Sequence, residues 1–235
     1  MSTGQAADRD KFCIQVYAAR PGWVKGIVGF RDARFLFERV LAVAPRVVVE
    51  VGTASGMSTA ILAHALELSG QGRLFTYDLR ERFYEDETRL VGDAAREMVP
   101  PEVLERITFR NPAVAIDAGR EHKAVDFAFI DGNHRHPWPA LDLLALLDAL
   151  PPGAEVALHD INLPIRYPGS AWGAKWLYDE LDVEKRADER SEMPDIGSVT
   201  IPTDKDDLRE QLLRTVHAHE WESDVRDEAL LALLG

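Results

Sequence analysis

Four polar side chains suited to acid–base or metal chemistry stand in two short stretches of the sequence. Asp131 and His134 lie in 125-VDFAFIDGNHRHP-137, and His159 and Asp160 lie in 152-PGAEVALHDI-161. Histidine titrates near neutral pH and can accept a proton from a hydroxyl group. Carboxylate oxygens bind hard cations such as Mg²⁺, whereas imidazole suits Mn²⁺, Fe²⁺ or Zn²⁺ better. Each residue also has a structural alternative, such as capping a turn, so the chemical interpretation requires that all four side chains meet.

A second candidate site is the turn in 46-RVVVEVGTASGMSTAILAHAL-66, where Glu50 ends an apolar run and two glycines follow. Glycines let the backbone approach a ligand closely, and the first turn of a helix offers free N–H groups to an anion. The spacing Gly52-x-x-x-Gly56 differs from the G-x-G-x-x-G pattern of dinucleotide sites. Because Glu50 would repel a pyrophosphate, we predict a ligand with a cationic amino group. A plain strand–turn–helix without a ligand is the alternative.

A third candidate is Asp78, at the end of the apolar stretch 73-RLFTYDL-79 and 26 residues after Gly52. A carboxylate at this strand end can accept hydrogen bonds from both hydroxyl groups of a ribose, as in dinucleotide-binding folds. The alternative is an ordinary solvated aspartate. Together with the glycine turn, the spacing favours a nucleoside ligand.

Alternating strand-like and helix-like segments must position these residues. The predicted strands are 46–51, 74–78, 107–109, 125–130 and 155–159, with two later candidates at 183–187 and 198–201. Helical patterns are expected at 31–45, 139–150, 171–181 and 205–220. Strands that alternate with helices predict a parallel sheet covered on both faces. The carboxyl ends of its strands share one edge, so we expect the candidate residues to converge there.

The segment EVGTASG at this place resembles the first motif of class I S-adenosylmethionine-dependent methyltransferases. The Asp-Gly-x-His and His-Asp stretches resemble the small-molecule O-methyltransferase branch, which includes the macrocin and catechol O-methyltransferases. The resemblance covers roughly residues 45–162. It implies an α/β, Rossmann-like doubly wound sheet of about seven strands, mostly parallel, with helices on both faces.

The resemblance also implies roles for individual residues. The turn would hold the methionine part of the cofactor, with Gly52 and Gly56 at the close approaches, Glu50 organising the loop, and the Ser58 and Thr59 hydroxyls meeting the carboxylate. Asp78 would bind the ribose, and Asn111 is only a candidate for the adenine because Asn111-Pro112-Ala113 replaces the usual triplet. The full set of predicted cofactor residues is Glu50, Gly52, Thr53, Gly56, Ser58, Asp78, Asn111 and Asp131.

For the reaction, the resemblance implies methyl transfer to a hydroxyl group of a small molecule, a sugar or another natural product. Mg²⁺ or Mn²⁺ would be held by Asp131, Asp160 and His159, although His159 stands where some relatives have a carboxylate. His134 is the first choice of general base and His159 the second. Two other functions stay open: a non-catalytic cofactor-binding partner protein and an NAD-linked oxidoreductase.

Composition restricts the binding partners and the cellular location that we expect for the protein. The formal net charge of −13 repels nucleic acids and anionic lipid surfaces, so neither is expected as a partner. Cys13 is the only cysteine, and neither a signal peptide nor a bilayer-length apolar run is present, so we predict a cytoplasmic protein. We divide the chain into an N-terminal appendage (1–30), for a cap or a dimer contact, a methyltransferase domain (31–202) and a helical tail (203–235). A homo-oligomer is a further possibility.

Overall fold

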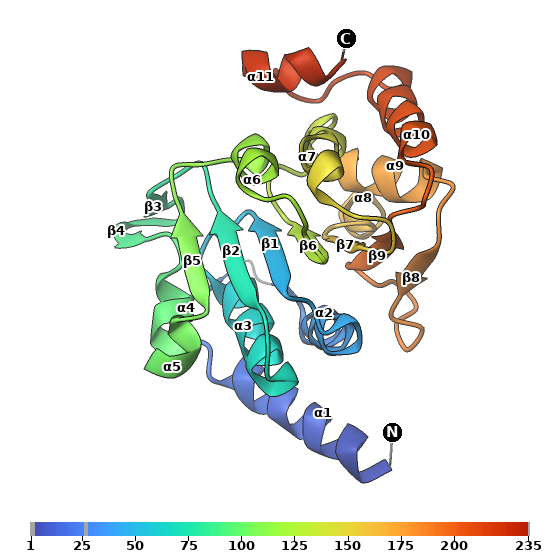
Figure 1. Ribbon diagram of the computed structural model, residues 1–235. Helices are drawn as coiled ribbons and strands as arrows, with labels where there is room; N and C mark the ends of the chain where they lie inside the picture. The colour runs from blue at the N-terminus through green and yellow to red at the C-terminus, as the bar shows by residue number, and fades with distance from the viewer. Residues whose placement is uncertain (1–2, 26–27, 235) are drawn as a thin grey trace.

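A computed structural model describes residues 3–25 and 28–234. Its centre is a seven-stranded sheet with the strand order β5-β2-β1-β6-β7-β9-β8 (Figure 1). Strands β5, β2, β1, β6 and β7 run parallel, whereas β9 runs antiparallel to both of its neighbours. The predicted Rossmann-like, mostly parallel sheet is confirmed. The strands are β1 (Val47–Val51), β2 (Arg73–Tyr77), β5 (Ile107–Arg110), β6 (Phe127–Ile130), β7 (Glu155–Leu158), β8 (Lys185–Ala187) and β9 (Gly197–Thr200).

Helices cover both faces of this sheet (Figure 1). One face carries α1 (Thr3–Ala18), α2 (Phe30–Val43), α3 (Met57–Ser69), α4 (Asp93–Met98) and α5 (Pro101–Leu104). The other carries α6 (Ala115–Glu121) and α7 (Trp138–Leu146), which a short 3₁₀ turn (Leu147–Ala149) extends, with α9 (Gly173–Glu180) and α10 (Lys205–Ala218) packed beside α7. The helix α8 (Leu163–Arg166) follows β7, and α11 (Glu228–Leu231) and a 3₁₀ turn (Ala232–Leu234) end the described chain.

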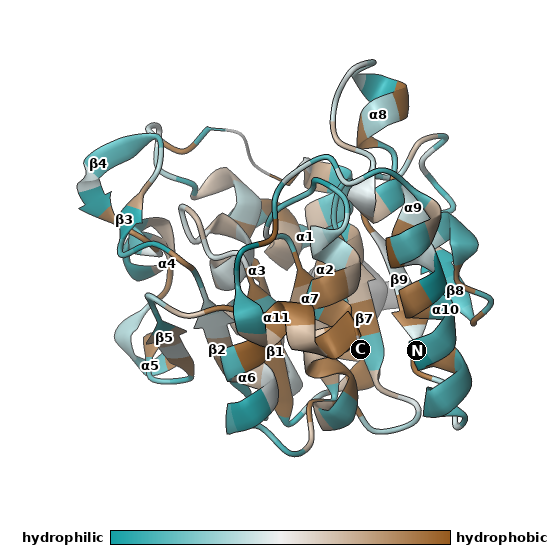
Figure 2. Ribbon diagram, turned by 90° about the horizontal axis from the view of Figure 1, so that it is seen from above, coloured by the Kyte–Doolittle hydropathy of each residue, from teal (hydrophilic) through white to brown (hydrophobic). Residues whose placement is uncertain are grey.

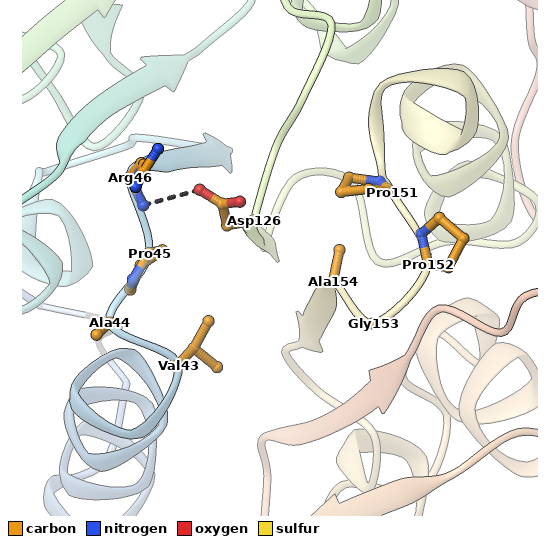
Figure 3. Close-up of a pocket in the computed structure, with 9 residues that line it drawn as sticks. All are labelled: Val43, Ala44, Pro45, Arg46, Asp126, Pro151, Pro152, Gly153 and Ala154. Carbon is orange, nitrogen blue, oxygen red and sulfur yellow. Dashed lines mark hydrogen bonds between the residues drawn. The ribbon is translucent and has the colours of Figure 1, made fainter.

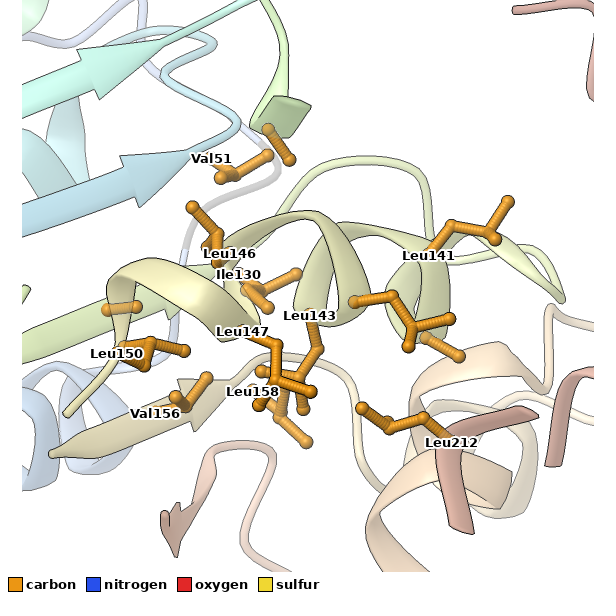
Figure 4. Packing of buried hydrophobic residues seen from close by; sticks show 14 of the residues in the cluster. Val51, Ile130, Leu141, Leu143, Leu146, Leu147, Leu150, Val156, Leu158 and Leu212 are labelled. Carbon is orange, nitrogen blue, oxygen red and sulfur yellow. The ribbon is translucent and has the colours of Figure 1, made fainter. Parts of the chain in front are cut away.

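The two faces have separate apolar cores, as expected for a sheet that is buried on both sides. Val51 and Ile130 of the sheet pack against Leu143 and Leu146 of α7 (Figure 4). On the opposite face Val48 and Phe127 join the core that α2 and α3 cover. Alternate residues of β1 thus point into different cores, which explains the nearly unbroken apolar run that predicted this strand.

The N-terminal segment belongs to the second core. Cys13 and Val16 of α1 are buried, and the Phe12 ring lies 5.8 Å from that of Phe37 in α2 and 5.6 Å from that of His64 in α3, between ring centroids. Residues 1–2 and 26–27 of the predicted appendage lie outside the described residues, and its role as a cap or dimer contact stays a prediction. No helix among the described residues has the length and apolar character required to cross a bilayer.

Sequence analysis did not predict the antiparallel hairpin of β3 (Arg82–Phe83) and β4 (Asp86–Leu90), nor the helices α1, α4, α5, α6 and α8. Both strands follow β2 directly. The first has two residues, and the second is mostly exposed and polar, so neither produces an apolar run that patterns can detect. Phe83 anchors the hairpin, since its side chain is buried and its ring lies 5.9 Å from that of Trp23.

Candidate active site

The carboxylate of Glu50 organises the turn after β1. Glu50 is completely buried, and its two oxygens accept hydrogen bonds from the hydroxyls of Ser58 (2.6 Å), Thr59 (2.6 Å) and Thr76 (2.6 Å). Burial raises the pKa of Glu50 to about 7, although these three hydrogen bonds oppose the shift. The predicted role of Glu50 in organising the loop agrees with these contacts.

These contacts differ from one detail of the sequence prediction. The Ser58 and Thr59 hydroxyls donate to Glu50 instead of pointing to a methionine carboxylate, and the Thr53 hydroxyl is hydrogen-bonded to that of Thr76 at 2.5 Å. A cofactor at this turn would therefore meet the free backbone N–H groups in the first turn of α3 rather than these hydroxyls. Cofactor binding by Thr53 and Ser58 stays a prediction.

The two glycines of the turn have positive φ angles, +95° at Gly52 and +92° at Gly56. A Cβ on Gly52 would lie 2.1 Å from the carbonyl oxygen of Asp131, and a Cβ on Gly56 would lie 2.8 Å from the Cα of Gly92. Both glycines therefore allow the protein's own backbone segments to come together. These neighbours are the loop after β6 and the turn after β4, and the close approach of both glycines to a ligand stays a prediction.

Asp78 links this turn to the end of β2. One carboxylate oxygen accepts a hydrogen bond from the backbone N–H of Ala54 (2.9 Å) and the other from that of Arg80 (2.8 Å). Asn111 follows the adjacent strand β5, and the Asp78 carbonyl accepts a hydrogen bond from Ala113, two residues further on (2.8 Å). The two predicted nucleoside contacts therefore lie side by side at the same edge of the sheet.

The predicted catalytic and metal-binding residues form one cluster at the ends of β6 and β7. The Nδ1 atom of His159 lies 2.9 Å from Oδ1 of Asp131 and 3.5 Å from Oδ1 of Asp160. The Nδ1 atom of His134 lies 3.1 Å from Oδ2 of Asp160, and its Nε2 lies 3.9 Å from Oδ1 of Asp131. The strand-end argument thus correctly predicted that the four side chains meet.

Charge is concentrated around His159. Burial lowers the pKa of its imidazole, but the nearby carboxylates of Asp131, Asp160 and Asp195 outweigh that effect and raise the pKa to about 10. Both ring nitrogens of His159 are buried, and neither makes a hydrogen bond of good geometry, although Nδ1 lies 2.9 Å from the Asp131 carboxylate. Buried nitrogens that face carboxylate oxygens without hydrogen bonds are suited to a cation shared by these groups.

The donor set satisfies a simple test for a divalent cation. Single ligand atoms of Asp131, His134 and His159 lie within 4.8 Å of one another, and the same holds for His159, Asp160 and Asp195. At a metal–ligand distance of about 2.1 Å, neighbouring ligands of an octahedral shell are about 3 Å apart. Three of the measured separations, at 2.9–3.5 Å, fit that spacing, whereas Nε2 of His134 lies farther from Oδ1 of Asp131, at 3.9 Å. His134 belongs to this set as well, which the sequence analysis had assigned only as a base.

The C-terminal segment supports the loop that carries His134. The Glu222 carboxylate accepts hydrogen bonds from the backbone N–H groups of His136 (2.7 Å) and Trp172 (2.9 Å), and the Glu222 N–H donates to the His136 carbonyl (2.9 Å). The indole of Trp138 donates to Ser223 (2.8 Å). Nothing in the sequence signals these contacts, because 86 residues separate Glu222 from the backbone that it holds.

Aromatic side chains at α9 pack against a histidine of the C-terminal segment. The Trp176 ring stacks on His219 at 3.9 Å with an angle of 4° between the planes, and the His219 imidazole contacts the Glu180 carboxylate. The Trp172 ring lies 5.6 Å from that of Trp176. His219 thus packs against α9.

The edge with the cluster is bordered by two projecting segments. Seen from above, the β3–β4 hairpin and α8 lie at opposite corners of the same side of the molecule (Figure 2). By contrast, a pocket of about 380 Å³ lies at the amino ends of β1, β6 and β7, beside Arg46, Asp126 and Gly153 (Figure 3). It is therefore at the other edge of the sheet from every predicted site residue.

Comparison with known proteins agrees with this geometry. Residues 49–161 match a family model described as a methyltransferase domain. No curated protein is significantly similar to the chain in sequence. The matched residues contain the glycine turn, Asp78 and the cluster of Asp131, His134, His159 and Asp160, and the predicted methyltransferase class is confirmed.

Solved structures share the fold at low sequence identity. The O-methyltransferase TomG of Streptomyces achromogenes, in complex with S-adenosylmethionine, has a TM-score of 0.54 at 18% identity and covers 83% of this chain and 90% of its own. An O-methyltransferase of Bacillus cereus, in complex with S-adenosylhomocysteine, has a TM-score of 0.51 at 20% identity, with 82% and 90% covered. The Podospora anserina methyltransferase PaMTH1 has a TM-score of 0.56 at 12% identity, with 87% and 98% covered.

Proposed function

We propose that this methyltransferase transfers a methyl group from S-adenosylmethionine to a hydroxyl group of a small molecule. The observation that carries the proposal is the meeting of two groups at neighbouring strand ends. The Glu50–Gly52 turn after β1 touches the backbone of Asp131 after β6, and Asp131 contacts His159 after β7. A cofactor seated on the turn would therefore lie beside the polar cluster. Complexes with S-adenosylmethionine and S-adenosylhomocysteine among proteins of similar fold support the same ligand.

For the cofactor, we assign the ribose to Asp78 and the amino-acid end to the turn. Each oxygen of Asp78 already accepts one backbone hydrogen bond, which fixes its orientation and leaves further lone pairs for hydroxyl groups. Asn111, beside Asp78, remains the proposed adenine contact. The Asp131 carboxylate, which lies close enough to Glu50 to contribute to its raised pKa, supplies negative charge for a cationic amino group and sulfonium.

For the reaction, His134 is the proposed general base. In the tautomer with the proton on Nδ1, which lies 3.1 Å from Oδ2 of Asp160, the Nε2 atom keeps a lone pair that can accept the acceptor's hydroxyl proton. The hydroxyl oxygen forms a bond to the methyl carbon while the carbon–sulfur bond breaks, and that electron pair stays on sulfur. His134 is also the more accessible of the two imidazoles, at 34% side-chain exposure against 12% for His159.

Asp131, Asp160 and His159 would hold a divalent cation in this proposal, with Mn²⁺ favoured over Mg²⁺ by the imidazole ligand. Such a cation lowers the pKa of a bound hydroxyl group. The acceptor must also reach this edge between the hairpin and α8. Both corners expose large apolar side chains, Leu79 and Tyr84 on the first and Ile165 and Tyr167 on the second. These side chains favour an acceptor that carries apolar surface beside its hydroxyl group.

Calorimetry with S-adenosylhomocysteine tests the cofactor assignment. We expect heat of binding for the wild type and at least tenfold weaker binding for Asp78→Asn. Asp148→Asn is the matched control, because that carboxylate is 87% exposed and pairs only with Arg209 at the surface. With hydroxylated acceptors as substrates, His134→Gln should lower kcat by about 100-fold or more. The absence of heat in the wild type at millimolar ligand would refute the proposal.

A further inference from the structure

Asp195 lies opposite the His159–Asp160 pair, although 35 residues separate it from Asp160 in the sequence. The antiparallel pairing of β7 with β9 matches Leu158 with Gly197, and the Ile161 N–H continues it by donating to the Asp195 carbonyl (3.1 Å). The Asp195 N–H donates to the carboxylate of Asp32 (2.7 Å), which is itself buried. The backbone of Asp195 is therefore fixed on both sides.

The two oxygens of the Asp195 carboxylate have different surroundings. The Oδ2 atom lies 2.6 Å from Nη1 of Arg166, at the end of α8. The Oδ1 atom is buried and makes no hydrogen bond, in a side chain whose residue is only 7% exposed. A buried carboxylate oxygen without a donor is costly, so this atom requires a partner that the described side chains do not provide.

The unpartnered oxygen belongs to the cluster of the active site. Ligand atoms of Asp195, Asp160 and His159 lie within 4.8 Å of one another, and both ring nitrogens of His159 also lack hydrogen bonds. The carboxylates of Asp131, Asp160 and Asp195 all lie close to this one imidazole. Arg166 neutralises only the outer oxygen of Asp195, so an excess of negative charge remains inside the cluster.

We propose that Asp195 is a further ligand of the divalent cation and supplies the carboxylate that His159 lacks at its own position. This inference depends on the cation site of the proposed function, but on neither the methyl donor nor the acceptor. It assigns a role to the antiparallel end of the sheet: β9 closes the cluster from the side opposite β6. The competing explanation is that Asp195 serves only as the structural partner of Arg166.

Two variants separate these explanations, with Mn²⁺ as the probe and electron paramagnetic resonance of free Mn²⁺ as the readout. Asp195→Asn removes the negative charge of the proposed ligand, whereas Arg166→Met removes the salt bridge and leaves the carboxylate in place. For a ligand, Asp195→Asn weakens Mn²⁺ binding at least tenfold and Arg166→Met does not weaken it. Asp188→Asn is the matched control, because Asp188 is also buried and paired to an arginine, Arg190. It should bind Mn²⁺ like the wild type.

Equal weakening by Asp195→Asn and Arg166→Met would overturn the inference, since the salt bridge alone would then matter. It would equally be overturned if Asp195→Asn binds Mn²⁺ as tightly as the wild type, or if the wild type binds none. S-adenosylhomocysteine calorimetry on the same samples keeps this result separate from the proposed function. Heat without Mn²⁺ binding rejects the Asp195 ligand and retains the methyltransferase site. Circular dichroism confirms that each variant is folded before titration.

Discussion

The ends of β1 and β7 each carry buried polar groups, but the two groups are satisfied in opposite ways. Glu50 receives three hydroxyl donors, from Ser58, Thr59 and Thr76, all at 2.6 Å. Neither ring nitrogen of His159 makes a hydrogen bond of good geometry, although the Asp131 and Asp160 carboxylates lie close to it. Both groups lie at the same edge of the sheet, on strands that are separated only by β6.

This difference distinguishes a residue that shapes a site from one that is available to a ligand. The Glu50 carboxylate is part of the fold, because its partners tie β1, β2 and α3 together. The cluster around His159 has donor atoms left over, so its energetic balance improves when something binds. A buried carboxylate can therefore be a structural element or a ligand, and the hydrogen bonds it makes distinguish the two.

The largest expected effect comes from removing the satisfied carboxylate. Glu50→Ala leaves three buried hydroxyls without an acceptor and opens a cavity, so we expect the free energy of unfolding to fall by about 4 kcal/mol. Urea denaturation followed by circular dichroism measures it. Glu67→Ala, on the more exposed side of α3, should change stability by less than about 0.5 kcal/mol. If Glu50→Ala lowers the free energy of unfolding as little as Glu67→Ala does, the Glu50 carboxylate is not the structural element that we contrast with the His159 cluster.

Asp142 sharpens the comparison, because it is a buried carboxyl group whose pKa burial alone raises to about 7. Below pH 7 the folded protein binds a proton here, which the unfolded chain releases near pH 4. Raising the pH from 4 to 7 should therefore destabilise the wild type relative to Asp142→Asn by roughly 3 kcal/mol, at about 1.4 kcal/mol for each pH unit, and the change should level off about one pH unit above 7. The titration of Glu50 changes the stability of both proteins equally, so it cancels in the difference between them.

Denaturation at several pH values measures this difference. Asp148→Asn, an exposed carboxylate in the 3₁₀ turn after α7, should follow the wild type throughout. If the stability difference between the wild type and Asp142→Asn does not depend on pH, Asp142 has an ordinary pKa. It would then belong with the solvated carboxylates.

The smallest effect is expected at the cluster itself. Asp160 has a φ angle of +62°, which asparagine adopts as readily as aspartate, so Asp160→Asn should change the free energy of unfolding by less than about 1 kcal/mol. Asp160→Ala tests the backbone contribution and should cost about 1 kcal/mol more. Thermal unfolding measures both. A loss for Asp160→Asn comparable to that for Glu50→Ala would show that the cluster is structural too.

Most of the sheet could be predicted because apolar runs and strand ends are local signals. The run from Val47 to Val51 gave β1 within one residue, and the parallel arrangement placed Asp78, Asp131 and His159 at one edge. Where local signals were weak, the prediction failed. The β3–β4 hairpin has too few buried residues to show a period, so its two strands were not predicted.

The sequence by itself determined which polar residues follow each strand. An acid and two glycines follow the first strand, Asp78 follows the second, and the Asp131–His134 and His159–Asp160 pairs follow two later strands. Parallel strands end at a common edge, so spacing alone predicts that these residues meet. Only the tertiary structure decided which hydroxyls Glu50 binds, and that Asp195 and Glu222 reach the site. Both arrive through contacts between distant segments, one across the β7–β9 pairing and one from the tail, and no local pattern encodes such contacts.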